Sequence, residues 1–128
     1  MVKIKGIAWG GSKTDKYEVT AKFFKDTLDF PVLSTENDVT IFRLPNGDIF
    51  EAVGPTQAVE LNEHVSGPKV DFLVDDVHTA RKELEQLGVK FLGPVYENPD
   101  QSWTHFWAPD GYLYGLTDMH GHPAHNYE

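Results

Sequence analysis

Two stretches of the chain carry the same alternation of apolar and polar residues around a turn. Residues 42–53 read FRLPNGDIFEAV and residues 106–117 read FWAPDGYLYGLT, so that phenylalanine, proline and glycine coincide at a spacing of 64. Proline presets φ before a tight turn, and glycine accepts the positive φ that such a turn requires. The pattern therefore predicts two β-hairpins that belong to an internal repeat.

Helical periodicity precedes each hairpin, over residues 20–28 and 79–87. In the second of these segments Ala80, Leu84 and Leu87 recur at helical spacing, and a glycine follows as a C-terminal stop. Strand character precedes both helices, at residues 4–9 and 70–74. Each half of the chain is thus predicted to form one strand, one helix and then three strands.

The repeat also predicts the domain organisation. With 128 residues the chain has the length of a single domain. We expect a first module at about residues 3–54 and a second at about 69–118. A linker rich in glycine and proline at its ends, residues 55–68, would join them, and residues 119–128 would form a tail.

Composition narrows the classes of function. The chain has no cysteine, which excludes disulfides, thiolate metal ligands and a cysteine nucleophile. Its formal charge of −9 and the lack of a basic cluster argue against nucleic acid as a partner. No apolar run approaches the length that spans a bilayer, and the first residues do not resemble an export signal. We expect a cytoplasmic protein without a membrane partner.

Three motifs in this order resemble the glyoxalase, bleomycin-resistance and extradiol-dioxygenase proteins, also called the vicinal oxygen chelate superfamily. They are the aromatic-rich residues 22–28 (KFFKDTL), the run Val74–Val77 that enters the second helix, and residues 108–111 (APDG) in the last hairpin. The resemblance implies an α+β fold in which two βαβββ modules form curved mixed sheets around a shared cavity. It further implies four inward-facing residues that hold a divalent cation.

Carried over position by position, the resemblance gives a poor metal site. Only Glu51 matches, as the acid of the first module's last strand. The other positions fall on Gly6 (or Ile4 if the register slips), Lys69 and Gly115. Glycine and isoleucine side chains offer no ligand atom, and a lysine ammonium repels a cation. We therefore expect no cofactor, although a divalent metal stays open as an alternative.

His105 is the candidate to complete a metal site with Glu51. If four residues, 108–111, form the turn, Gly115 lies opposite Thr104, and the His105 side chain points to the other face of the sheet. We therefore expect a structural histidine. A bulge would reverse this expectation.

Without a metal, the same cavity would be lined by charged and aromatic side chains. Lys69 and Glu51 are the candidate catalytic residues, as a general acid and base, and an intramolecular ion pair is the structural alternative. The hairpin parity of Phe42 and Phe106 predicts that both face the cavity. The full set of expected ligand-binding residues is Asp71, Leu73, Phe42, Trp103, Thr104, Phe106 and Gly115.

These features favour a metal-independent small-molecule-binding protein with its ligand between the modules. The alternative is a glyoxalase-type lyase or isomerase, or another enzyme of the superfamily. Such an enzyme would use Glu51 with a divalent metal, or Glu51 with Lys69 as acid and base. Whether the chain is an enzyme stays open at this point, as does pairing into a homodimer.

Overall fold

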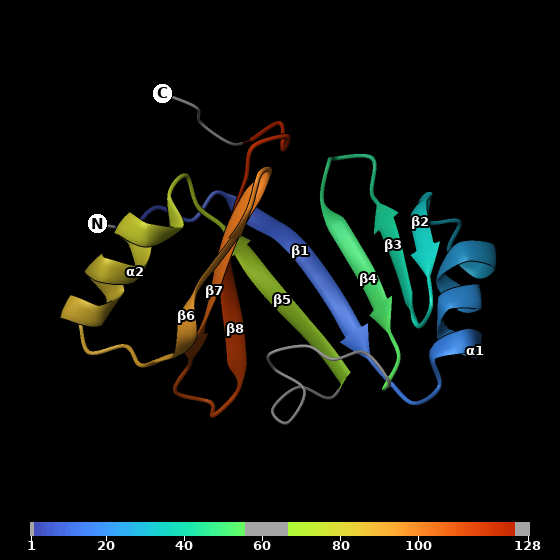
Figure 1. The fold of residues 1–128 in the computed structure, drawn as a ribbon, viewed down its shortest axis with the longest axis horizontal. Coiled ribbons are helices and arrows are strands. Elements are labelled where there is room, and N and C mark those ends of the chain that lie inside the picture. The colour runs from blue at the N-terminus through green and yellow to red at the C-terminus, as the bar shows by residue number, and fades with distance from the viewer. Residues whose placement is uncertain (1, 56–66, 125–128) are drawn as a thin grey trace. The chain divides into compact units, whose positions relative to one another are not determined.

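The computed structural model describes residues 2–55 and 67–124, and it confirms the predicted α+β fold with two βαβββ modules (Figure 1). The first module contains β1 (Gly6–Lys13), α1 (Tyr17–Lys22), the π-helical segment η1 (Phe23–Thr27), β2 (Val32–Glu36), β3 (Val39–Arg43) and β4 (Ile49–Val53). The second contains β5 (Gly67–Leu73), α2 (Val77–Gln86), β6 (Phe91–Asn98), β7 (Gln101–Trp107) and β8 (Leu113–Met119).

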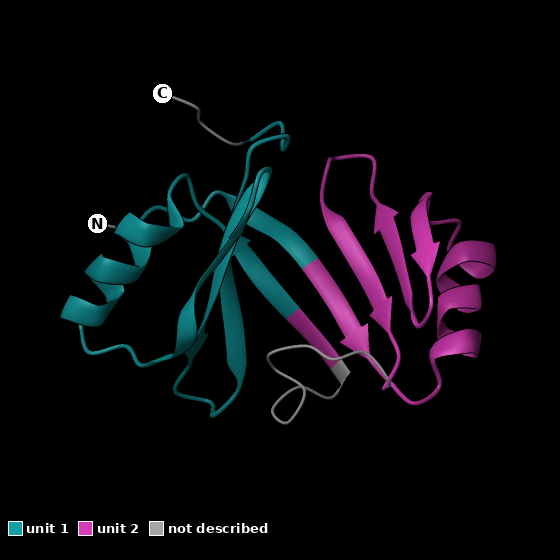
Figure 2. Ribbon diagram, viewed as in Figure 1, with its two compact units in different colours: residues 1–9, 70–128 teal, residues 10–69 magenta. Residues whose placement is uncertain are grey.

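The chain divides into two compact units, which are coloured separately in Figure 2. Unit 1 comprises residues 1–9 and 70–128, and unit 2 comprises residues 10–69. The division passes through β1 and β5, so each of these strands contributes residues to both units. In unit 1 the strand order is β5-β8-β7-β6, with β5 and β8 parallel and the other pairs antiparallel. In unit 2, β2, β3 and β4 form an antiparallel run.

The predicted repeat extends to the hydrogen bonds of the two turns. The N–H of Leu44 donates to the carbonyl of Asp48 at 2.8 Å, and the N–H of Ala108 donates to that of Tyr112 at 3.0 Å. The fourth residue of each turn is a glycine, with φ of 97° in the first and 87° in the second. Both hairpins are confirmed, and both close through five-residue turns, at 44–48 and 108–112.

The second helix, predicted over residues 79–87, spans Val77–Gln86 and is followed by the predicted glycine. Asp76 caps α2, since its Oδ1 accepts a hydrogen bond from the N–H of Thr79 at 3.1 Å. Gly88 follows the helix with φ of 91°, a conformation that disfavours any residue with a Cβ. Within the described residues, no helix has the length and apolar character needed to cross a membrane.

A buried carboxylate holds the start of α2 against the sheet of unit 1. Asp118 on β8 is 5% exposed. Its Oδ2 accepts from the N–H of Val77 at 3.0 Å, and its Oδ1 accepts from the N–H of Ser102 on β7 at 2.9 Å. Val77 and Ala80 then pack with Val74 and Leu116 in a buried apolar cluster. One carboxylate therefore fixes the end of α2 that contributes most to this core.

A second link between α2 and the sheet lies at the surface. His78 contacts the carboxylate of Glu97 on β6 through a hydrogen bond. This bond raises the pKa of the imidazole above its ordinary value. Both side chains are more than half exposed, so solvent screens the pair. We therefore assign the position of α2 to Asp118 and to packing.

Substitution of Asp118 by alanine should destabilise the protein by about 3 kcal/mol, because the buried N–H of Val77 and the partly buried N–H of Ser102 would lose their acceptor. Asp76→Ala is the matched control, since it removes a cap at the exposed side of the same helix end and should cost about 1 kcal/mol. Urea denaturation followed by circular dichroism measures both. Equal losses for the two variants would contradict the role given to Asp118.

Candidate functional site

The sheet of unit 1 presents two faces, and the strand register assigns residues to each. Gly115 on β8 pairs with Asp71 on β5 and with His105 on β7. Thr117, two residues further along β8, pairs with Leu73 and Trp103. Paired residues point to the same side of a sheet. We call this side the Gly115 face, and it carries Asp71, Leu73, Trp103, His105, Gly115 and Thr117.

Asp71 is buried at the centre of the Gly115 face, with 5% of its surface exposed. Its Oδ2 accepts a hydrogen bond from the hydroxyl of Thr117 at 2.9 Å. The carboxylate lies directly over Gly115, where a Cβ on residue 115 would overlap with Oδ1 of Asp71. A glycine is therefore required on β8 for the carboxylate to take this position.

Thr117 was missed as a site residue by the sequence reasoning, although a signal for it was present. Alternation along β8 from Gly115 places the side chain of residue 117 on the same face. Thr117 is only 1% exposed, and its hydroxyl donates a hydrogen bond to the carboxylate of Asp71. Burial of a carboxylate costs more free energy when no hydrogen-bond donor replaces the lost water.

The predicted register of the last hairpin is wrong by one residue. Gly115 lies opposite His105, and Thr104 lies opposite Leu116. The cause is the turn, which contains five residues instead of four because Tyr112 belongs to it. A shift of one residue exchanges the faces of a strand. His105 therefore shares the face of Asp71, and it is 4% exposed.

The same shift moves two expected ligand-binding residues to the other side of the sheet. Thr104 is fully buried there and accepts a hydrogen bond from Arg81 of α2 at 2.8 Å. Phe106 packs against the apolar cluster beneath α2 and stacks on Tyr114 at a centroid distance of 6.0 Å. The prediction that Phe106 faces the cavity side is corrected accordingly. We call this side, with Phe72, Thr104, Phe106, Tyr114 and Leu116, the helix face.

Phe42 in unit 2, like Phe106 in unit 1, lies on the side of its strands that packs against a helix. It pairs with Phe50 and is fully buried. The ring of Phe24 from η1 lies 6.2 Å from that of Phe42 and 4.8 Å from that of Phe50, and Phe30 adds a further ring contact at 5.7 Å. The predicted cavity orientation of Phe42 is therefore corrected: it belongs to an aromatic core beneath the first helix.

An aromatic pair borders the polar residues of the Gly115 face. Trp103 stacks on Tyr96 of β6 with a centroid distance of 5.9 Å and an interplanar angle of 23°. The Tyr96 ring also lies 6.4 Å from that of His105. Leu73, the remaining expected ligand-binding residue of this face, is fully buried. The face thus combines a carboxylate, an imidazole and partly exposed aromatic rings.

The two candidate catalytic residues lie in unit 2. Glu51 on β4 is half-buried and pairs with Ile41, so it points away from Phe42 and Phe50. Lys69 on β5 is buried, with 8% of its surface exposed. Their roles as acid and base stay predictions.

The residues present do not fit the divalent cation that the fold implies. Among the described residues, no three His, Asp or Glu side chains come together as a metal site would require. At residue 115 the glycine leaves no ligand, and the carboxylate of Asp71 fills the space that an acidic side chain there would need. The alternative pair, Glu51 and His105, provides two ligands and lies in different units.

Comparisons with known proteins place this arrangement within a known fold. No family model matches the sequence, and no curated protein matches it either. Solved structures do match. Methylmalonyl-CoA epimerase from Mycobacterium tuberculosis is 16% identical with a TM-score of 0.70, over 91% of this chain and 89% of that one. This epimerase has the vicinal oxygen chelate fold, which the chain shares.

Two further structures show how widely the fold is used. A variant of Streptomyces coelicolor methylmalonyl-CoA epimerase, in complex with 2-nitronate-propionyl-CoA, is 18% identical with a TM-score of 0.72 and covers 97% of this chain and 99% of its own. A protein described as an NAD-dependent benzaldehyde dehydrogenase from Legionella pneumophila is 13% identical with a TM-score of 0.65, over 87% of this chain and 97% of its own. At these identities the likeness concerns the fold and does not extend to a reaction.

Gly115→Ala should destabilise the protein by about 2 kcal/mol, because the added methyl group overlaps with the Asp71 carboxylate and forces it to move. Gly121→Ala is the control, since a Cβ there meets nothing within 4 Å. Combining Gly115→Ala with Asp71→Ala should make the two effects non-additive, because the overlap is absent in the double variant. Urea denaturation of the parent protein, Gly115→Ala, Asp71→Ala, the double variant and Gly121→Ala tests this, and equal stability of the Gly115 and Gly121 variants would contradict the close approach.

Proposed function

We propose that the chain is a small-molecule-binding protein of the vicinal oxygen chelate fold, and that it binds its ligand without a metal on the Gly115 face. The observation that carries the proposal is the burial of the Asp71 carboxylate over Gly115, beside His105 and Thr117. Burial of a carboxylate costs free energy of desolvation. Ionisable side chains in such environments are often found at functional sites.

The chemistry of this face favours a polar or zwitterionic ligand. A carboxylate attracts an ammonium or another hydrogen-bond donor. The Trp103 and Tyr96 rings beside it offer flat apolar contact and the capacity for cation–π attraction. The formal charge of −9 disfavours a polyanion such as a coenzyme A thioester.

The side chains at the four metal-ligand positions of the family support binding without a metal. Of the four family positions only Glu51 has an acidic side chain, and Asp71 fills the space next to Gly115 where another would stand. Asp71 thus places a carboxyl group of the protein itself on the Gly115 face. A cationic group of the ligand would take the electrostatic role that the cation has in metal-binding relatives.

A second candidate is an isomerase or lyase that moves a proton. It is favoured by the row Asp71, Gly115 and His105, in which an acid and an imidazole flank a residue without a side chain. An imidazole titrates near neutral pH and can give or take a proton next to a carbonyl group. Glu51 and Lys69 are the further acid and base candidates for such a reaction. Exchange of a ligand C–H proton for deuterium in D₂O would distinguish this enzyme from a binding protein.

A melting-temperature screen in EDTA tests the proposal. Free amino acids and betaines serve as zwitterions, acetate and propionate as simple anions, and coenzyme A thioesters as polyanions. At least one zwitterion should raise the melting temperature, because a ligand present at 100 times its Kd stabilises the folded state by about 2.7 kcal/mol. Asp71→Asn, which keeps an acceptor for Thr117, should abolish the shift.

Trp103→Phe provides the matched variant on the same face, since it keeps an aromatic ring and all charges. In this variant the ligand should still raise the melting temperature, but by less than in the parent protein. Elemental analysis of tag-free protein that has not met a chelator accompanies the screen. A stoichiometric divalent metal that is lost in Glu51→Ala would contradict the proposal. Stabilisation by coenzyme A thioesters alone would also contradict it.

A further inference from the structure

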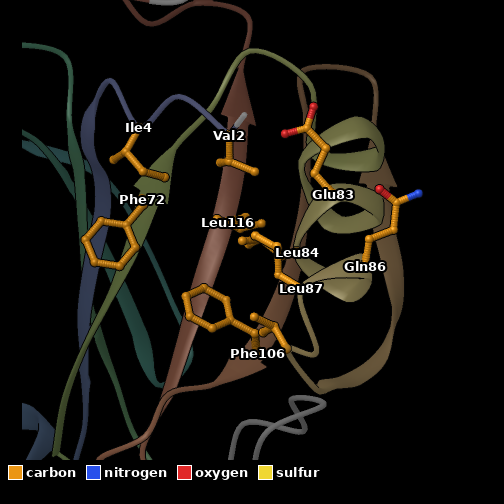
Figure 3. Close-up of a pocket in the computed structure, with 10 residues that line it drawn as sticks. Val2, Ile4, Phe72, Glu83, Leu84, Gln86, Leu87, Phe106 and Leu116 are labelled. Carbon is orange, nitrogen blue, oxygen red and sulfur yellow. The ribbon is translucent and has the colours of Figure 1, made fainter.

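An apolar pocket of about 730 Å³ lies on the helix face of unit 1, beneath the second half of α2 (Figure 3). The sheet contributes Phe72, Phe106 and Leu116 to its wall, and the helix contributes Leu84 and Leu87. The residues on the sheet belong to the face opposite to Asp71, Gly115 and His105. The pocket is therefore separate from the Gly115 face.

The side chains of α2 that face the sheet are most deeply buried near the start of the helix. At its start, Asp118 binds the helix N-terminus, and Val77 and Ala80 are buried in the core. Two turns later Leu84 is only partly buried and Leu87 is 79% exposed. The pocket is open to solvent, and its volume lies within the range of about 300 to 1,000 Å³ that is common for ligand pockets.

The wall of the pocket specifies the chemistry of its occupant. Eight of the ten lining residues are apolar, and two of these are phenylalanines. The polar ones are Glu83 and Gln86, both on α2, so Glu83 is the lining residue that carries a charge. A carboxylate at the border of an apolar pocket repels an anion, and the formal charge of −9 acts in the same direction.

From this pocket we propose a second binding site, which takes an uncharged apolar molecule with the dimensions of a few aromatic rings. The site is independent of the proposed function, because it uses neither Asp71 nor any other residue of the Gly115 face. Its affinity comes from removal of apolar surface from water, and its selectivity against anions comes from Glu83.

Two fluorescent probes with the same ring system test the site. N-phenyl-1-naphthylamine is uncharged, and 8-anilinonaphthalene-1-sulfonate adds one negative charge to it. Titration of the full chain should give enhanced fluorescence and saturable binding with the uncharged probe, and weaker binding with the sulfonate. Glu83→Gln should narrow the difference in affinity between the two probes by about threefold or more, because it removes the repelling charge.

Leu87→Glu and Val19→Glu form the matched pair of variants. Both replace a largely exposed apolar residue, 79% exposed at Leu87 and 66% at Val19, so neither change should prevent folding. Val19 lies on α1 in unit 2 and is not one of the residues that line this pocket. Leu87→Glu should weaken binding of the uncharged probe by about tenfold, since it places a charge beside the apolar wall. Val19→Glu should leave the binding unchanged.

Two results would overturn the site. In the first, both variants bind the uncharged probe as tightly as the parent protein does. In the second, sedimentation shows that Leu87→Glu converts a dimer into a monomer without a change in probe affinity. That outcome would mean that a second copy of the chain covers the pocket. Failure of the zwitterion screen would leave the proposal on this pocket unaffected, because the two sites share no residue.

Discussion

The close approach of the Asp71 carboxylate to Gly115 is the constraint on which the site depends. A carboxylate can lie over β8 only where that strand has no side chain, and residue 115 is the glycine that provides this space. Thr117 then supplies the hydrogen bond that makes burial of the charge tolerable. The same volume is where the resemblance would place an acidic metal ligand. In this chain that position is a glycine, and the acid stands on the neighbouring strand.

The two faces of the unit 1 sheet have different chemistry because the strands alternate. Residues of β8 with odd numbers from 113 to 119 point to the side of Asp71 and His105, and those with even numbers point to α2. The side to which the first set points also carries Asp71 from β5 and Trp103 and His105 from β7. The second set gives the core around Leu116 and the apolar pocket beyond it. Asp118 belongs to the second set and fixes α2 at the end where the core is closed.

Much of the fold could be predicted from the sequence, because its local signals agree with one another. The repeated Pro-Asn-Gly and Pro-Asp-Gly turns and the glycine after α2 each have a direct physical cause that acts within a few residues. The side of the sheet to which each strand residue points could be predicted less reliably. It depends on whether Tyr112 belongs to the turn or to β8, and that one residue decides the sides of Thr104, His105 and Phe106. Comparison of the two repeats could not correct this error, since the first turn has the same ambiguity.

The direct test of ligand binding on the Gly115 face is a methyl-detected NMR titration in EDTA with a zwitterion that raises the melting temperature. Leu73 and Leu116 serve as reporters, because they are both fully or almost fully buried and lie on opposite faces of the same sheet. We expect the methyl signals of Leu73 to shift with the ligand while those of Leu116 stay in place. Shifts confined to Leu116, or shifts of Leu73 that need an added divalent metal, would contradict metal-free binding on the Gly115 face.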